Sequence, residues 1–275
     1  MPDFSAILPS ESLQFVLEGS FLIFTLVLAR VSGLVMTAPI YGTQDVPVRV
    51  RALLAVALAM LIAPLHVGGF SIQINSLVAY AVLIGGELII GLVLGMGIRI
   101  LFSGIQVAGQ IIGQMSGMAL ADVFNPGFNE NVPLFSQILY FVTLAVFVLT
   151  GGHRLVMEAL LDTFAAMPPG HASFSEHIVE ALISTLAESF SLGVRAAAPV
   201  MTALLLATLV LGLISRTMPQ LNIIAVGFGI NALVTFGGLF VSLGALVWIF
   251  QEQIEPLLSL LSGALVGTPV DPGGT

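Results

Sequence analysis

The sequence has 275 residues, of which 57% are hydrophobic and 8% charged, with a formal net charge of −8 at pH 7. A soluble domain carries about 25% charged residues, so this composition excludes an ordinary soluble fold and indicates a protein solvated by the bilayer. Every basic residue is an arginine and there is no cysteine, which excludes a basic nucleic-acid footprint, disulfides and thiolate metal sites.

Six apolar runs predict an all-α, polytopic membrane protein whose helices form hairpins. The runs cover 13–38, 52–65, 77–98, 133–150, 190–214 and 223–250. The second run has about 14 residues, fewer than the roughly 20 of a spanning helix, so it indicates a broken or re-entrant helix or a helix buried in protein. We expect the first run to be retained, since no basic residue precedes it. We further expect one helical membrane domain over 1–267 and a disordered tail over 268–275.

The arginines between the runs give a topology signal. Arg49 and Arg51 lie between the first two runs, Arg99 follows the third, and Arg216 lies between the last two. The positive-inside rule predicts that these three connections are cytoplasmic and that both termini lie outside. Arg154 falls on the opposite side.

A stretch of small and amide side chains follows the third run. On a helix, residues three and four apart share a face. The residues on that face are Ser103, Gln106, Gln110, Gln114 and Gly117. Gly109, Gly113 and Gly117 repeat every fourth residue, a spacing that lets another helix approach closely. Because amides are costly against lipid, this face should meet protein or water. Spacing alone leaves two interpretations, a pore-lining or gating element and tight helix packing.

The residues just after this helix combine methionines with a turn signal. Met115 and Met118 precede Asp122, and Asn125, Pro126 and Gly127 follow. Methionine is flexible and fills irregular gaps, so these side chains could form a compliant seal at a constriction. The alternative is that they are ordinary core methionines, which is the more common role of methionine.

Several ionisable residues interrupt the apolar runs, and such residues in membranes are expensive and often functional. We predict Glu87 and Arg195 as buried charges paired between helices, while Arg30 and Arg99 could extend to the membrane interface. Glu87 and Arg99 are about 18 Å apart along one helix, so their partners must come from other segments. No second acid in its own run supports a proton relay through Glu87.

An amphipathic helix precedes the fifth run. Glu176, Glu180, Ser184 and Glu188 step by four along one face. Acidic residues at this spacing indicate a face in contact with water.

Enzyme motifs are absent. There is no zinc-protease, nucleophile-elbow, P-loop or dinucleotide-binding signature, and the four histidines are not at metal-ligand spacing. We therefore expect no catalytic centre, no metal and no cofactor.

Four ordered groups of residues resemble the FliR family of flagellar export-gate proteins and its injectisome counterparts. They begin at Arg30-Val31-Ser32-Gly33, at Gly109-Gln110, at Gly152-His153, and at Arg216 with Pro219-Gln220-Leu221-Asn222. Together they span nearly the whole chain. Where the family often continues with Gly-Phe-Pro and a basic residue, this chain has Gly227-Phe228-Gly229 and then Asn231.

The resemblance implies a core subunit of the type III export gate in the bacterial inner membrane, at the flagellar basal body. Such subunits assemble with FliP and FliQ into a channel for unfolded proteins, and a loop plugs the closed pore. By position, the plug corresponds to 113–129, with Ser103, Gln106, Gly109 and Gln110 lining the pore or packing beside it. The last two helices would form a FliQ-like hairpin, and FlhB would contact its turn at Arg216, Pro219, Gln220 and Asn222.

Two other interpretations use the same residues. Broken helices and intramembrane charges favour a small-solute secondary transporter, although such proteins usually show an inverted repeat, and none is visible here. A structural scaffold is the other, with the glycine and glutamine face used for packing alone.

Overall fold

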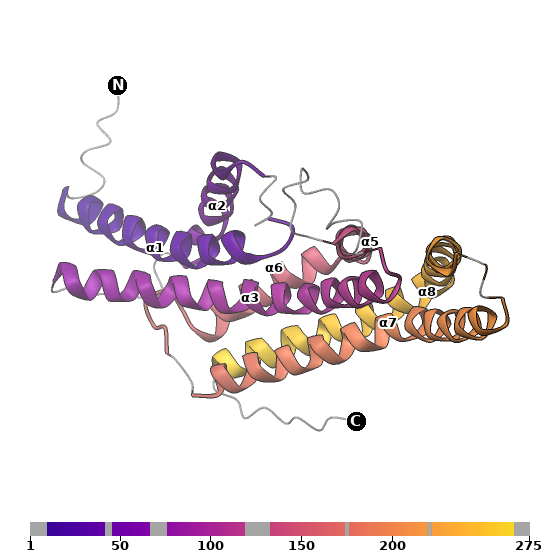
Figure 1. The fold of residues 1–275 in the computed structure, drawn as a ribbon. Helices are drawn as coiled ribbons and strands as arrows, with labels where there is room; N and C mark the ends of the chain where they lie inside the picture. The colour runs from indigo at the N-terminus through magenta and orange to yellow at the C-terminus, as the bar shows by residue number, and fades with distance from the viewer. Residues whose placement is uncertain are drawn as a thin grey trace. The chain divides into compact units, whose positions relative to one another are not determined.

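The computed structural model describes residues 10–41, 46–66, 76–118, 133–173, 176–218, 220 and 222–266. Every element in these ranges is a helix, and the all-α prediction is confirmed for them (Figure 1). The elements are α1 (Ser10–Thr37), α2 (Val48–Ile62), η2 (Ala63–His66), α3 (Leu77–Met115), α5 (Leu134–Leu149), α6 (Gly152–Ala166), α7 (His177–Thr217) and α8 (Ile223–Val266). The predicted tail, 268–275, lies outside the described residues.

Helix length and composition confirm a polytopic membrane protein. Among the described residues, five helices are long and apolar enough to cross a membrane. The pair α5 and α6, bent by 67° at its break, would make a sixth span. With 39, 41 and 44 residues, α3, α7 and α8 are each about 60 Å long. Each is therefore about twice the thickness of the hydrocarbon layer, roughly 30 Å.

The structure differs from the predicted helices in three places. The third helix continues past Ile98 to Met115, so Arg99 lies within α3 and not in a connection. Glycine, glutamine and serine do not end a helix whose faces are packed by other elements. The segment after 151, where the apolar runs predicted no helix, contains α6. The amphipathic segment and the fifth run form one continuous helix, α7, with Pro199 inside it.

The chain packs as two compact units, each assembled from separate stretches of sequence. The first comprises 1–99, 154–182 and 258–275. In it, α1 and the first half of α3 run side by side in contact (Figure 1), because glycines bring the two backbones together. A Cβ at Gly91 would collide with the backbone carbonyl of Arg30, and one at Gly33 with that of Leu88. This is the close approach that small residues permit between membrane helices.

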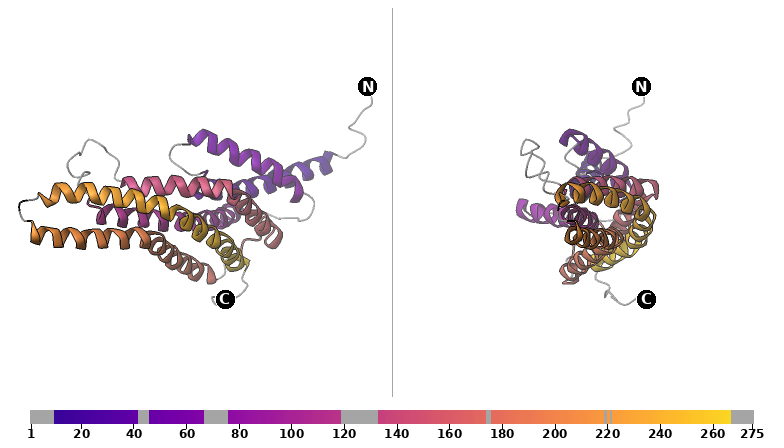
Figure 2. Two further views of the ribbon diagram at one scale, coloured as in Figure 1. Left: turned by 90° about the vertical axis from the view of Figure 1, so that its right-hand side faces the viewer. Right: turned by 45° about the vertical axis from the view of Figure 1, so that its right-hand side comes forward.

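The second unit comprises 100–153 and 183–257. The antiparallel hairpin of α7 and α8 carries much of it, and the orange ends of both helices run together to their connection (Figure 2). Phe102 of α3 lies at the centre of an aromatic cluster, with ring centroids 5.5 Å from Phe147 and 5.2 Å from Phe250 in edge-on geometry. All three rings are buried. Edge-to-face contacts at these distances add to the stabilisation from burial.

Candidate functional site

The second half of α3 carries the predicted stretch of small and amide side chains, here called the seam, and Gly109 and Gly113 of this seam face another helix of the same chain. A Cβ at Gly109 would collide with the backbone of Ser136 at the start of α5. The Ser136 hydroxyl donates a hydrogen bond of 2.8 Å to the Gln106 carbonyl at the same crossing. Gly113 is looser, since a Cβ there would lie 3.7 Å from the Phe135 ring. Here the packing interpretation of the glycine stripe describes the contact.

A second close crossing joins α3 to α7. A Cβ at Gly104 would collide with the Ser189 carbonyl, and one at Gly193 with the Gly104 carbonyl. Gly104 and Gly193 were not among the residues predicted for the site. The signal that could have found them is a small residue on each helix, which lets two helix backbones approach closely.

The glutamines of α3 have different surroundings from its glycines. Gln110 and Gln114 are exposed, while Ser103 and Gln106 are half-buried. Adjacent helix residues differ by about 100° in direction, so Gly109 meets α5 while Gln110 points away from it. The described helices therefore leave Gln110 and Gln114 uncovered, although hydrocarbon is a poor environment for amide side chains.

The segment predicted as the plug, 113–129, begins in the last turn of α3. The Ser116 hydroxyl donates to the Gly113 carbonyl at 2.9 Å and accepts from the Met118 N–H at 3.3 Å. Gly117 has φ +75°, a left-handed conformation that glycine adopts without steric cost. Met115 and Met118 are both half-buried beside this turn. Four further predicted plug residues, Asp122, Asn125, Pro126 and Gly127, lie outside the described residues.

The predicted partner contacts lie at the connection between α7 and α8. Arg216 is exposed in the last turn of α7, and Gln220 and Asn222 are exposed beyond it. Pro219 lies outside the described residues. Arg216 and Gln220 are therefore at the surface of the chain.

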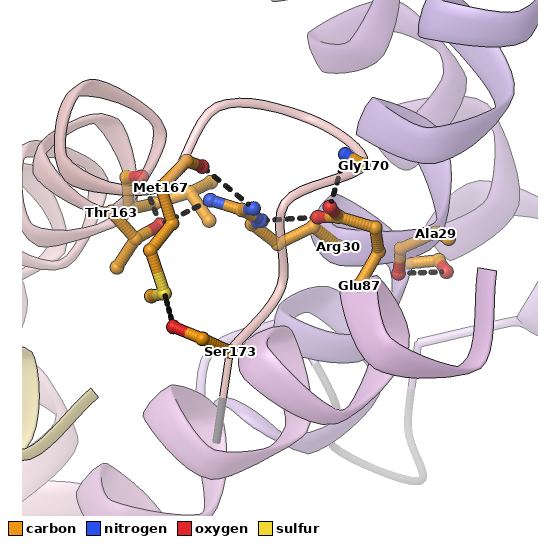
Figure 3. A network of polar contacts seen from close by, with 9 residues as sticks. Ala29, Arg30, Glu87, Thr163, Met167, Gly170 and Ser173 are labelled. Carbon is orange, nitrogen blue, oxygen red and sulfur yellow. Dashed lines mark hydrogen bonds and ion pairs between the residues drawn. The ribbon is translucent and has the colours of Figure 1, made fainter. Parts of the chain in front are cut away.

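Glu87 is fully buried, and its partner is Arg30 of α1 (Figure 3). Glu87 Oε2 accepts from Arg30 Nε at 2.6 Å, and Oε1 accepts from the Gly170 N–H at 2.8 Å. The guanidinium also donates to Thr163 Oγ1 at 3.1 Å and to the Met167 carbonyl at 3.0 Å. Both ions are thus surrounded by hydrogen-bond partners, which a buried ion pair needs in order to offset desolvation.

These hydrogen bonds connect α6 and the residues after it to α1 and α3. Arg30, for which an extension to the membrane interface was considered, is fully buried, and its guanidinium carbon lies 4.2 Å from the Phe164 ring centroid. Sequence reasoning showed that Glu87 needed a partner from another segment but did not identify it. Arg195, predicted as the other buried charge, is exposed on α7.

Comparison with known proteins supplies the family. Residues 21–257 match a family model described as "Bacterial export proteins, family 1". The chain is 30% identical over 248 residues to the flagellar biosynthetic protein FliR of Escherichia coli K12, covering 88% of this chain and 92% of that protein. The Caulobacter vibrioides FliR is 29% identical over 240 residues (86% and 94% covered), and the Bacillus subtilis FliR is 29% identical over 252 residues (89% and 95% covered).

The apolar helices and these matches define a multi-pass membrane protein of a bacterial export system. The chain belongs to the FliR family of bacterial export proteins, and its role is in flagellar protein export. The relatives are named as flagellar biosynthetic proteins.

Proposed function

We propose that this chain is a core subunit of the flagellar type III export gate and forms, with FliP and FliQ, the channel through which unfolded flagellar proteins leave the cell. In this proposal the gate lies in the bacterial inner membrane at the basal body, and FlhB contacts the connection between α7 and α8. No bond is made or broken by the chain.

The observation that carries the proposal is that the glycines and the glutamines of α3 have different surroundings. Gly109 packs inside the chain against α5, whereas Gln110 and Gln114 remain exposed one step around the helix. An exposed amide face on an apolar helix needs protein or water beside it. In a channel wall, neighbouring subunits would supply the protein and the passage would supply the water.

The plug is assigned to the segment that begins in the last turn of α3. The left-handed Gly117 redirects the chain directly after the amide face, with Met115 and Met118 beside the turn. An arriving substrate would displace this segment, and methionine side chains would adapt to the changing contents.

Deleting 119–125 tests the plug while keeping the α3–α5 crossing at Gly109 intact. We expect the variant complex to assemble and the membrane to leak ions, measured as loss of membrane potential with a voltage-sensitive dye. Deleting the segment 68–74, of equal length, is the matched control and should not cause a leak. An assembled 119–125 deletion with unchanged conductance would defeat the plug assignment.

A small-solute secondary transporter is the alternative. The buried Arg30–Glu87 pair gives it little support, because Glu87 is fully buried and both of its oxygens accept hydrogen bonds. Uptake of a solute into vesicles containing the purified chain alone would favour transport. Co-purification with two other small helical membrane proteins would favour the gate.

A further inference from the structure

Arg195 lies on a face of α7 that the other described helices leave uncovered. Two residues earlier, Gly193 meets α3 at Gly104, and five residues later Val200 meets α8 at Gly238. At about 100° per residue, the Arg195 side chain points away from both contacts. It is exposed, as are Ser191 and Ala198 on the same face.

Within the part of the chain that the structure describes, Arg195 has no ion-pair partner. The salt bridge there is Arg30–Glu87, and His177 lies near Glu180 in a contact that is an ion pair only when the imidazole is protonated. The nearest acid on its face, Glu188, is about 10 Å away along the helix axis. Because an arginine stays charged in proteins, the guanidinium brings a full positive charge to the edge of an apolar segment. The segment that follows, 196–214, contains no ionisable residue. Its length is close to the roughly 20 residues of a membrane-spanning helix.

Pro199 adds a second polar group at the same turn. A proline has no N–H, so the Arg195 carbonyl lacks its usual helical donor four residues on. The turn therefore presents a cation and a backbone acceptor together. Hydrocarbon can satisfy neither group.

Small side chains flank this turn. Ser191 and Ala198 lie one turn to either side of Arg195 and are exposed. Small residues let a second helix approach closely enough for a direct polar contact. A single arginine anchoring the chain to lipid headgroups has no need of such neighbours, so the surroundings favour a protein.

We propose that the Arg195 turn of α7 is a docking point for a helix of a neighbouring membrane subunit, and that this helix presents a carboxylate to the guanidinium. Two parallel N–H···O bonds from the guanidinium would hold the carboxylate. A donor on the same helix would bond to the Arg195 carbonyl. The inference rests on the proposed function, because it requires an assembly of different subunits. The partner is identified only by the carboxylate that its helix would carry.

The absence of lysine from the sequence allows a selective test. The substitution Arg195→Lys would introduce a single side-chain amine, and the hydrophobic reagent dicyclohexylcarbodiimide would couple that amine to a carboxylate in direct contact. We expect a zero-length crosslink from position 195 to an Asp or Glu of another subunit in the assembled complex, identified by mass spectrometry. The control, Arg99→Lys at an exposed position of α3, should not give that product.

A crosslink to Glu188 of the same chain, or an assembled Arg195→Lys complex with no crosslink, would overturn the docking assignment while leaving the export role intact. If Arg195→Lys does not assemble, a photo-crosslinking residue at Ser191 keeps Arg195 in place. Adducts of that probe with an acidic segment of another subunit support the proposal, and adducts with lipid alone contradict it. A wild-type chain that co-purifies with no other membrane protein would instead refute the proposed function.

Discussion

Removing the charge of Glu87 should destabilise the first unit far more than removing an exposed carboxylate. In Glu87→Gln the side chain keeps its shape, but the Arg30 guanidinium, fully buried, loses its counter-ion. Breaking a buried pair by changing one partner costs about 3–5 kcal/mol, because the remaining ion stays desolvated and uncompensated. At about 1.4 kcal/mol per factor of ten, that loss lowers the folding equilibrium constant by roughly two to three and a half orders of magnitude.

The chain offers a matched control in an exposed contact that is an ion pair only when its histidine is protonated. His177 and Glu180 lie 3.7 Å apart, with side chains 38% and 79% exposed. An exposed pair of this kind contributes about 0–1 kcal/mol, so Glu180→Gln should be nearly neutral. The two variants remove the same charge from the same residue type and differ in burial.

The assay is unfolding of the purified protein in dodecylmaltoside titrated with SDS, followed by far-UV circular dichroism. We expect a large shift of the midpoint for Glu87→Gln and a small one for Glu180→Gln. The double variant Arg30→Met/Glu87→Leu should recover much of the loss, since replacing both ions with apolar side chains removes the unpaired charge. Equal midpoints for the two single variants would refute the reasoning.

Further variants test the seam and the turn. Gly109→Ala should cost about 1–3 kcal/mol through its collision with Ser136, whereas Gly113→Ala, with room for a Cβ, should be neutral or slightly stabilising in the same unfolding assay. Ser136→Ala should lose about 0.5–1.5 kcal/mol, since it removes the hydrogen bond to the Gln106 carbonyl; no change would mean that the bond contributes nothing. Gly117→Val should cost about 1–2 kcal/mol at φ +75°, and Gly117→Asn much less; equal stability would contradict a left-handed turn.

Composition and periodicity predict the helices but not their ends. The apolar runs predicted a polytopic helical protein because six stretches could not be solvated by water. They did not show that α3 continues through Arg99 to Met115. A local pattern cannot reveal that Gly104 and Gly109 will be packed by α7 and α5, so that the helix continues through its glycines and glutamines.

The candidate site was predicted in part. Spacing identified the small and amide residues of α3, but it grouped Gly109 and Gln110 as one feature. The structure separates them, because a step of about 100° moves the side chain from the α5 contact to the open face. Glu87 was recognised as a charge in need of a partner. That Arg30 is the partner depends on contacts between α1, α3 and α6, which no single run of sequence contains.

The central claim is that the amide face of α3 borders other subunits and a protein-conducting passage. A photo-crosslinking residue placed at Gln110 or Gln114, in cells exporting flagellar proteins, tests it most directly. The account predicts adducts with neighbouring subunits or with protein in transit at both positions. Adducts with lipid alone at both positions, in a complex that still assembles and exports, would contradict it.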